Sequence, residues 1–381
     1  MAVERLEVAV HEFPLDEPES DGTLTWDATT MVIVEASADG TTGVGYSYGA
    51  AACATVVQEK LRDVAVGSDP MDVGGTWERM VRAIRNLGRP GVVSHAISAV
   101  DLALWDLKAR LLDVSLAELL GAVREEVPVY GSGGFTSLSN DDMERQLLGW
   151  VRDRGIPRVK IKVGEDWGRR PGVVSHAISA VDLALWDLKA RLLDVSLAEL
   201  LGAVREEVPV YGSGGYTRKQ AVRLGRAFAD HGVTWFEEPV SSDDLEGLRE
   251  IRDQVEPDVA AGEYGYDLAY FQRMLRAGAV DCLQADVTRC GGITEFLRVG
   301  ALAAANGVQL SAHCAPAASA APCAAVHMFR HLEHFADHER IESLAFDGVL
   351  DPKDGVLRPD RSRPGTGLEL KRTDIERFRR S

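Results

Sequence analysis

Apolar and polar residues alternate along the first part of the chain as they do in β-strands. Residues 1 to about 50 have this rhythm, and Thr30–Ala36 is rich in β-branched side chains and precedes the turn dipeptide Asp39-Gly40. From about residue 52 to 122 the apolar residues have helical spacing, and Gly121 stands where a helix should end. One apolar stripe in this region consists of Ile97, Val100, Ala103, Leu104, Leu107 and Leu111. We predict a small α+β domain over residues 1–125.

The segment Asp16–Asp27 departs from the strand rhythm. It reads DEPESDGTLTWD, which is polar and rich in turn-forming residues. Such a composition is typical of surface connections. We predict a mobile loop between two strands.

From Val127 onward, short apolar runs alternate with longer amphipathic segments. Strand–helix alternation of this kind favours parallel βαβ units, and units that recur about every 25 residues predict a (β/α) barrel over residues 126–350. The C-terminal segment 351–381 then packs on the first domain. A doubly wound open sheet is the alternative, but its phosphate loop is poorly matched by Gly131-Ser132-Gly133-Gly134. The predicted strands are Val127–Tyr130, Arg158–Val163, Thr234–Glu237, Asp258–Ala261, Cys282–Gln284 and Val308–Ala312.

A block of 46 residues occurs twice without a difference, as Arg89–Gly134 and Arg170–Gly215. Structural repeats usually drift in sequence, and solenoids need at least three units to bury a continuous core. Two perfect copies therefore indicate a copying event. The second copy, residues 170–215, falls inside the predicted barrel.

Composition narrows the class of protein. The chain has 381 residues, of which 45% are hydrophobic, so it is long enough for a barrel with an added domain. A net charge of −17 opposes nucleic-acid binding and means that an anionic substrate needs local cations or a metal. We find no apolar run of membrane length and no secretory leader, and we expect no membrane association. The five cysteines include no CxxC pair, which favours buried, reduced thiols in a cytoplasmic protein.

Ionisable residues stand at the ends of the predicted barrel strands. Lys160 and Lys162 flank Ile161, so both lysines share one face of their strand, which would be the inside of a barrel. Five more residues follow at separations of 26, 23, 27 and 20 positions, about one βα unit each: Glu237, Glu263, Asp286, His313 and Glu333. Because active sites of such barrels lie at the C-terminal strand ends, we expect these side chains to converge.

The residue types indicate proton abstraction next to a carboxylate. Converging carboxylates suit Mg²⁺, which can bind an acid substrate and stabilise the charge that forms when the α-proton leaves. Two neighbouring lysines should lower each other's pKa, which would yield a general base. An aspartate beside a histidine orients the imidazole as a second acid or base.

With these motifs the chain resembles the enolase superfamily, specifically the mandelate racemase subgroup of the mandelate racemase/muconate lactonizing enzyme family. The resemblance spans nearly the whole chain, including SAVDLALWDLKARLLDVSLAELLG, KIK, EEP, GE and DVTRCGGIT. It implies Mg²⁺ ligands at Glu237 and Glu263. It also implies bases at Lys162 and at His313, the latter held by Asp286. Lys160 would tune Lys162 or touch the substrate carboxylate, and Glu333 would hydrogen-bond the developing enediolate.

The chain departs from this family at the first metal ligand. The resemblance calls for an aspartate one strand before EEP, and counting back 26 residues from Glu237 reaches Tyr211 inside the second copy, with Ser213 where an asparagine is expected. A neutral phenol, whose pKa is about 10, binds Mg²⁺ poorly. We therefore expect weakened metal binding, although a shifted strand register would make Tyr211 an ordinary core residue.

Three functions follow from these observations. The first is Mg²⁺-dependent dehydration of an acid sugar, the second is racemisation or epimerisation of a 2-hydroxy acid, and the third is an impaired or inactive barrel. A small carboxylic acid is the expected partner, and the resemblance implies a homo-oligomer. Simpler interpretations also stay open: the two lysines as surface residues on an edge strand, and Asp286 and His313 as unrelated polar residues. A more specific alternative is a Zn²⁺ site on a helix, because four histidines recur at helical spacing: His327, His331, His334 and His338.

Overall fold

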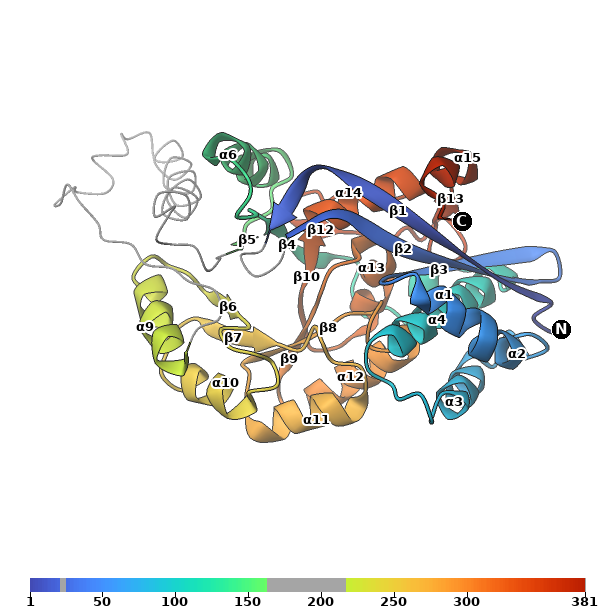
Figure 1. Ribbon diagram of the computed structural model, residues 1–381, viewed down its shortest axis with the longest axis horizontal. Helices are drawn as coiled ribbons and strands as arrows, with labels where there is room; N and C mark the ends of the chain where they lie inside the picture. The colour runs from blue at the N-terminus through green and yellow to red at the C-terminus, as the bar shows by residue number, and fades with distance from the viewer. Residues whose placement is uncertain (21–24, 163–216, 381) are drawn as a thin grey trace.

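The structure, a computed structural model, describes residues 1–20, 25–162 and 217–380 (Figure 1). The second copy of the repeated block, with Tyr211 and Ser213, lies outside these residues. No helix of the described residues is long and apolar enough to cross a membrane.

The chain begins with an antiparallel sheet of three strands, β1 (Arg5–Ser20), β2 (Thr25–Ala38) and β3 (Thr41–Tyr48). The predicted turn at Asp39-Gly40 is confirmed, since both residues have positive φ angles of 50° and 73°. Helices follow: α1 (Ala52–Val56), the π-helical η1 (Val57–Leu61), α2 (Arg62–Ala65), α3 (Val73–Ala83), α4 (Val92–Leu111) and α5 (Leu116–Leu119). Of these, α1 and α4 pack directly against the sheet.

The predicted loop at Asp16–Asp27 is wrong in its described parts. β1 continues to Ser20 and β2 begins at Thr25, and Glu19 pairs with Trp26 across the ribbon. Ladder hydrogen bonds come from the backbone, so polar side chains do not prevent a two-stranded ribbon. The Trp26 ring also packs edge-on against Phe135, with centroids 5.7 Å apart, which holds the ribbon over the end of the first barrel strand.

The predicted apolar stripe lies on α4 and is buried in a core shared with β1 and β2, apart from Leu111, which is half-buried. Gly121 follows α5 with φ 70°, as its position at a helix end predicts. The approach of α4 to β3 is unusually close, because a methyl group at Gly45 would lie 2.3 Å from the backbone of Ala99 and Ala103. Small residues on the strand therefore decide where the helix lies.

Seven parallel strands form the curved sheet in the centre of Figure 1, as far as the described residues go. Their order is β5-β4-β10-β9-β8-β7-β6. The first strand of this sheet along the chain, β4, therefore pairs both with the second strand, β5, and with the last, β10. A doubly wound sheet has a topological switch point and no such cyclic order. The barrel prediction is therefore confirmed. The strands are β4 (Val127–Gly133), β5 (Val159–Ile161), β6 (Trp235–Glu237), β7 (Asp258–Ala261), β8 (Cys282–Ala285), β9 (Gln309–Ala312) and β10 (Phe329–Phe335).

Helices cover the outside of these strands (Figure 1). They are α6 (Asn140–Leu148), the π-helical η2 (Gly149–Asp153), α9 (Arg218–Ala229), α10 (Leu245–Arg252), α11 (Leu268–Ala277), α12 (Gly292–Ala305), α13 (Pro316–Ala325) and α14 (Ala336–Ala345). Capping side chains start several of them; Thr217 and Gln220, for example, form a reciprocal capping box at α9.

The last residues return to the N-terminal sheet. β12 (Val356–Leu357) pairs antiparallel with β4, and β11 (Phe346–Asp347) pairs with β13 (Glu369–Leu370). The short helices α15 (Arg372–Ile375) and η3 (Glu376–Phe378) follow. Ion pairs from Arg372 to Glu35 and from Arg380 to Glu12 join this tail to β2 and β1.

Four histidines that share helical spacing do not share a helix. His327 precedes β10, His331 and His334 lie within it, and His338 lies in α14. The alternative of a zinc site on one helix is therefore wrong, because the chain changes from strand to helix at Phe335.

Candidate active site

The ionisable residues singled out in the sequence gather at the C-terminal ends of the barrel strands. Lys160 lies in β5 and Lys162 directly after it, while Glu237 ends β6 and Glu263 follows β7. Asp286 and His313 come directly after β8 and β9, and Glu333 lies in β10. The parallel strands bring these side chains to one end of the sheet, where salt bridges and hydrogen bonds join six of the seven: Lys160, Glu237, Glu263, Asp286, His313 and Glu333.

Lys160 holds two carboxylates at once. Its Nζ lies 2.7 Å from Glu237 Oε1 and also pairs with Glu333 Oε1, and only 10% of the Lys160 side chain is exposed. Lys160 is thus not a surface lysine. Burial alone would lower its pKa, but Glu237 and Glu333 outweigh burial and raise the pKa well above its usual value. The expectation that the two lysines lower each other's pKa is therefore wrong at Lys160, because carboxylates contact its amine directly.

Asp286 and His313 form a buried pair. His313 Nδ1 lies 2.7 Å from Asp286 Oδ2, and the backbone and hydroxyl of Thr288 each donate a hydrogen bond to Asp286 Oδ1 at 2.7 Å. Burial alone would raise the pKa of Asp286, but the His313 hydrogen bond and the charge of Arg289 lower it. The aspartate stays ionised and leaves the other ring nitrogen, Nε2, facing the site.

The second ring nitrogen of His313, Nε2, faces two more carboxylates. His313 Nε2 lies 3.2 Å from Glu263 Oε2 and 3.5 Å from Glu333 Oε2. Burial opposes the imidazolium, but these charges and Asp286 raise the pKa of His313 above its ordinary value of 6.5. Conversely, burial would raise the pKa of Glu263, but His313, Arg289 and the lysines lower it to about 2.

Lys162 approaches the same cluster from the end of β5. Its Nζ lies 5.7 Å from the centre of the Phe335 ring, at the end of β10. Its charge helps to lower the pKa of both Glu263 and Glu333, the two carboxylates that His313 Nε2 contacts. Lys162 and His313 therefore act on a common pair of acidic groups.

Arg289 and Gln284 belong to the cluster and were missed in the sequence. Arg289 Nε lies 3.2 Å from Asp286 Oδ2, and its Nη1 lies 3.3 Å from Glu263 Oε1. Gln284 Nε2 donates to Glu237 Oε2 at 3.3 Å. Arg289 stands in the motif DVTRCGG three residues after Asp286, and Gln284 two residues before it, so proximity to a strand end was the available signal.

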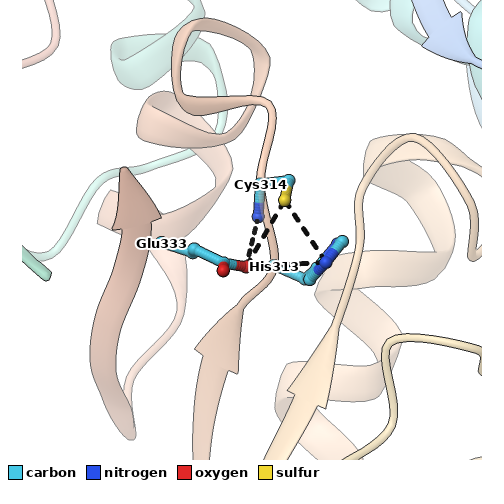
Figure 2. Close-up of side chains that lie close together, drawn as sticks. All are labelled: His313, Cys314 and Glu333. Carbon is cyan, nitrogen blue, oxygen red and sulfur yellow. Dashed lines mark hydrogen bonds and ion pairs between the residues drawn. The ribbon is translucent and has the colours of Figure 1, made fainter. Parts of the chain in front are cut away.

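Cys314 is a third residue of the cluster that the sequence did not single out. Its Sγ lies 3.2 Å from His313 Nε2 and 3.4 Å from Glu333 Oε2 (Figure 2). The prediction that the cysteines are free and buried is confirmed for all five.

The donor chemistry fits a divalent cation near β6 and β7. Glu237 and Glu263 present carboxylate oxygens, the ligands that Mg²⁺ prefers. Glu238 adds a further carboxyl group, whose Oε1 is buried without a hydrogen-bond partner among the described residues. Burial and the charges of Glu263 and Glu237 raise the pKa of Glu238 to about 9. Glu238 therefore stays protonated in this arrangement, and a cation bound beside Glu237 and Glu263 would favour its ionised form.

Comparison with known proteins decides the family. A model for the N-terminal domain of mandelate racemase / muconate lactonizing enzyme matches residues 5–121, and an enolase C-terminal domain-like model matches residues 142–374. The chain belongs to the mandelate racemase/muconate lactonizing enzyme family of the enolase superfamily.

Relatives in this family are lyases and isomerases. The chain is 30% identical to L-talarate/galactarate dehydratase of Salmonella typhimurium over 93% of this chain and 86% of the relative. A mandelate racemase/muconate lactonizing enzyme-like protein from Rubrobacter xylanophilus is 48% identical, with a TM-score of 0.88 and full coverage of both chains. A racemase from Streptomyces coelicolor A3(2) with bound magnesium is 29% identical, with a TM-score of 0.83 over 99% of this chain and 100% of that one. Magnesium is bound in that racemase structure, and the dehydratase and the racemase are a lyase and an isomerase.

Proposed function

We propose that this chain is a Mg²⁺-dependent acid-sugar dehydratase, which removes the proton α to a carboxylate and expels the β-hydroxyl as water. The observation that carries the proposal is the buried Asp286–His313 pair, whose free Nε2 meets Glu263 and Glu333 in the same cluster as the lysines. The similarity to L-talarate/galactarate dehydratase supports the substrate class.

Each side chain would have one task. Glu237 and Glu263 would hold magnesium, which supplies positive charge against the substrate carboxylate and the charge that forms on it. Lys160, kept cationic by its two carboxylates, would bind the substrate carboxylate. Lys162 would take the α-proton on one face of the substrate. Once Lys160 turns to the substrate carboxylate, Glu333 would lose its ion-pair partner, take up a proton and donate a hydrogen bond to the resulting enediolate.

His313 would act on the other face as an acid. The raised pKa of its imidazole favours the protonated ring, which can give the Nε2 proton to the departing β-hydroxyl. Lys162 would thus remove the α-proton, and His313 would protonate the β-hydroxyl, which departs as water. The product of these two steps is an enol, which tautomerises to a 2-keto-3-deoxy acid. Racemisation is the alternative, because two groups on opposite faces can also exchange one proton.

A product assay separates these reactions. Purified protein with Mg²⁺ is given a panel of acid sugars in D₂O, and both 2-keto acid and α-proton exchange are measured. We expect keto acid from at least one substrate. Its loss in Lys162→Ala and in His313→Asn, but not in the distant control Lys353→Ala, would support the assigned roles. Exchange of the α-proton without keto acid would exclude the dehydratase and favour the racemase.

The exact repeat favours a second candidate, an impaired enzyme. Tyr211, which lies outside the described residues, stands where the resemblance calls for a metal-binding aspartate. We expect Tyr211→Asp to tighten Mg²⁺ binding at least tenfold in calorimetric titration, a difference of about 1.4 kcal/mol. Micromolar binding by the unchanged chain would show that Tyr211 does not stand at the ligand position.

We also propose a cytoplasmic homo-oligomer that binds a small hydroxy or sugar acid. Five buried free thiols support a reducing compartment. Sedimentation velocity tests the oligomeric state, and a single monomeric species at micromolar concentration would contradict it.

A further inference from the structure

We propose that His313, Cys314 and Glu333 form a second metal site, selective for a thiophilic divalent ion such as Zn²⁺, and that an ion bound there inhibits the enzyme. The site differs from the magnesium site in its ligands, because it offers one sulfur, one nitrogen and one oxygen. Its metal binding does not depend on the proposed reaction, whereas the inhibition does.

The three ligand atoms have the spacing of one face of a tetrahedral zinc site. Cys314 Sγ lies 3.2 Å from His313 Nε2 and 3.4 Å from Glu333 Oε2, and these last two atoms are 3.5 Å apart. With zinc–ligand bonds of about 2.0–2.3 Å, tetrahedral geometry places such ligands about 3.3–3.6 Å from one another. All three side chains are buried, and no other such group occurs among the described residues. Figure 2 shows the three groups pointing toward one another, with Glu333 on β10 and with His313 and Cys314 just after β9.

Neighbouring groups keep the three ligand atoms turned toward one another. Asp286 forms a hydrogen bond with His313 Nδ1 and leaves Nε2 directed at the other two ligand atoms. Zinc-binding histidines are commonly held by a carboxylate in this way. Lys160 pairs with Oε1 of Glu333 and leaves Oε2 to the other two ligands. Cys314 and Ala315 have positive φ angles of 49° and 45°, which residues with a Cβ rarely adopt, and this turn brings the thiol back over the strand end.

Ligand chemistry gives the selectivity. A thiolate and an imidazole suit Zn²⁺, whereas Mg²⁺ prefers oxygen. The Cys314 thiol loses its proton to water as the sulfur–zinc bond forms. Since the ion would occupy His313 Nε2 and Glu333 Oε2, both side chains would be withdrawn from the reaction while Glu237 kept its place.

Cobalt provides a direct test of binding. The full-length protein, saturated with Mg²⁺ to fill the carboxylate site, is titrated with Co²⁺ and followed by absorption. We expect one equivalent to produce a near-ultraviolet thiolate-to-cobalt band and the intense visible bands of tetrahedral Co²⁺, both displaced by Zn²⁺. A titration without the thiolate band would overturn the proposal.

Matched variants locate the ligand. Cys314→Ala should abolish the band and weaken Zn²⁺ binding at least about tenfold, because the loss of even an outer-shell partner costs 10–100-fold. Cys323→Ala, which removes another buried thiol, should keep both the thiolate-to-cobalt band and the affinity for Zn²⁺. A band that survives Cys314→Ala would also overturn the proposal, and Cys314→Ser serves if the alanine variant does not fold.

Inhibition is measured separately. Zn²⁺ should stop turnover in the wild type, should not be relieved by more Mg²⁺, and should have at least tenfold less effect on Cys314→Ala. If no acid sugar is turned over, the cobalt spectrum still decides the metal site, so failure of the proposed function and failure of the zinc site give different results. Equal inhibition of both proteins would overturn the inhibitory role.

Discussion

At the scale of single residues, the site depends on charges that compensate one another out of water. Lys160 is buried, yet two carboxylates hold it in its charged form. Without them burial would favour the neutral amine. The same principle keeps Glu263 and Glu333 ionised beside His313. A change to one member of such a cluster therefore alters the protonation of the others.

Asp286→Asn tests the orientation of His313. The amide is neutral and can present an N–H to the ring, so the pKa of His313 should fall and its tautomer should change. We expect kcat to fall by about 10²–10⁴-fold with a smaller change in KM, and the pH limb that belongs to His313 to move to lower pH. Asp281→Asn, outside the cluster, is the control. A pH–rate profile that does not move would contradict the assignment.

The metal ligands can be tested by charge. Glu237→Gln and Glu263→Gln each remove one negative charge and one strong oxygen ligand, so each should weaken Mg²⁺ binding by tenfold or more, about 1.4 kcal/mol. Glu339→Gln is the matched control, because Glu339 is also a partly buried carboxylate but pairs with Arg154 and His334 outside the cluster. Calorimetric titration measures all three. Equal losses in the three variants would indicate a general charge effect.

At the scale of elements, the contact between β3 and α4 holds the N-terminal sheet against its long helix. Gly43 and Gly45 allow the backbone of the strand to approach the backbone of the helix. The helix then continues the connection into the barrel: Asp101 accepts hydrogen bonds from Thr294 at the start of α12. The helix α4 lies in the first copy of the repeated block, so the first copy occupies these contact sites on β3 and α12.

Gly45→Ala should therefore destabilise the protein. The added methyl group would lie 2.3 Å from backbone atoms of α4, which cannot move aside as a side chain can. We expect the free energy of unfolding to fall by roughly 1–3 kcal/mol in denaturant titration. Gly74→Ala in α3, where a methyl group meets nothing within 4 Å, should instead raise it by roughly 0.4–1 kcal/mol. Equal changes in the free energy of unfolding for the two variants would show that the close approach of β3 to α4 does not contribute to stability.

At the scale of the whole molecule, the charge cluster should give stability a pH optimum. The pKa of Glu263 is lowered from 4.5 to about 2, so its contribution is present above pH 4.5 and is lost as the pH falls toward 2. The pKa of His313 is raised above 6.5, so its contribution is complete below pH 6.5 and is lost as the pH rises through the folded-state value. Both contributions are present between about pH 4.5 and 6.5.

Denaturant titrations across the pH range measure this optimum. Glu263→Gln should flatten the acidic limb and His313→Asn the alkaline limb, each by up to about 1.4 kcal/mol per pH unit. Other buried groups contribute to the wild-type curve, so the difference between wild type and variant is the quantity to compare. A difference that is constant with pH would contradict the assignment.

The sequence alone was enough for the features that depend on local spacing. Strand runs, the stripe on α4, the turn at Asp39-Gly40 and the spacing of the strand-end residues all follow from side-chain periodicity. The barrel followed as well, because residues at regular βα intervals can converge only where parallel strands share an end. The family motifs then indicated which of these residues to examine.

Only the tertiary structure decided which groups contact one another. Arg289 and Cys314 differ little from other residues in the sequence, and their roles come from distances to Glu263, His313 and Glu333. The direction of the Lys160 pKa shift depends on two partners that lie 77 and 173 positions away, at Glu237 and Glu333. The ribbon at Glu19 and Trp26 was mistaken for a loop because its stability comes from backbone pairing and from Phe135, more than 100 residues away. Electrostatic and packing energies depend on separation in space, and separation along the chain does not determine it.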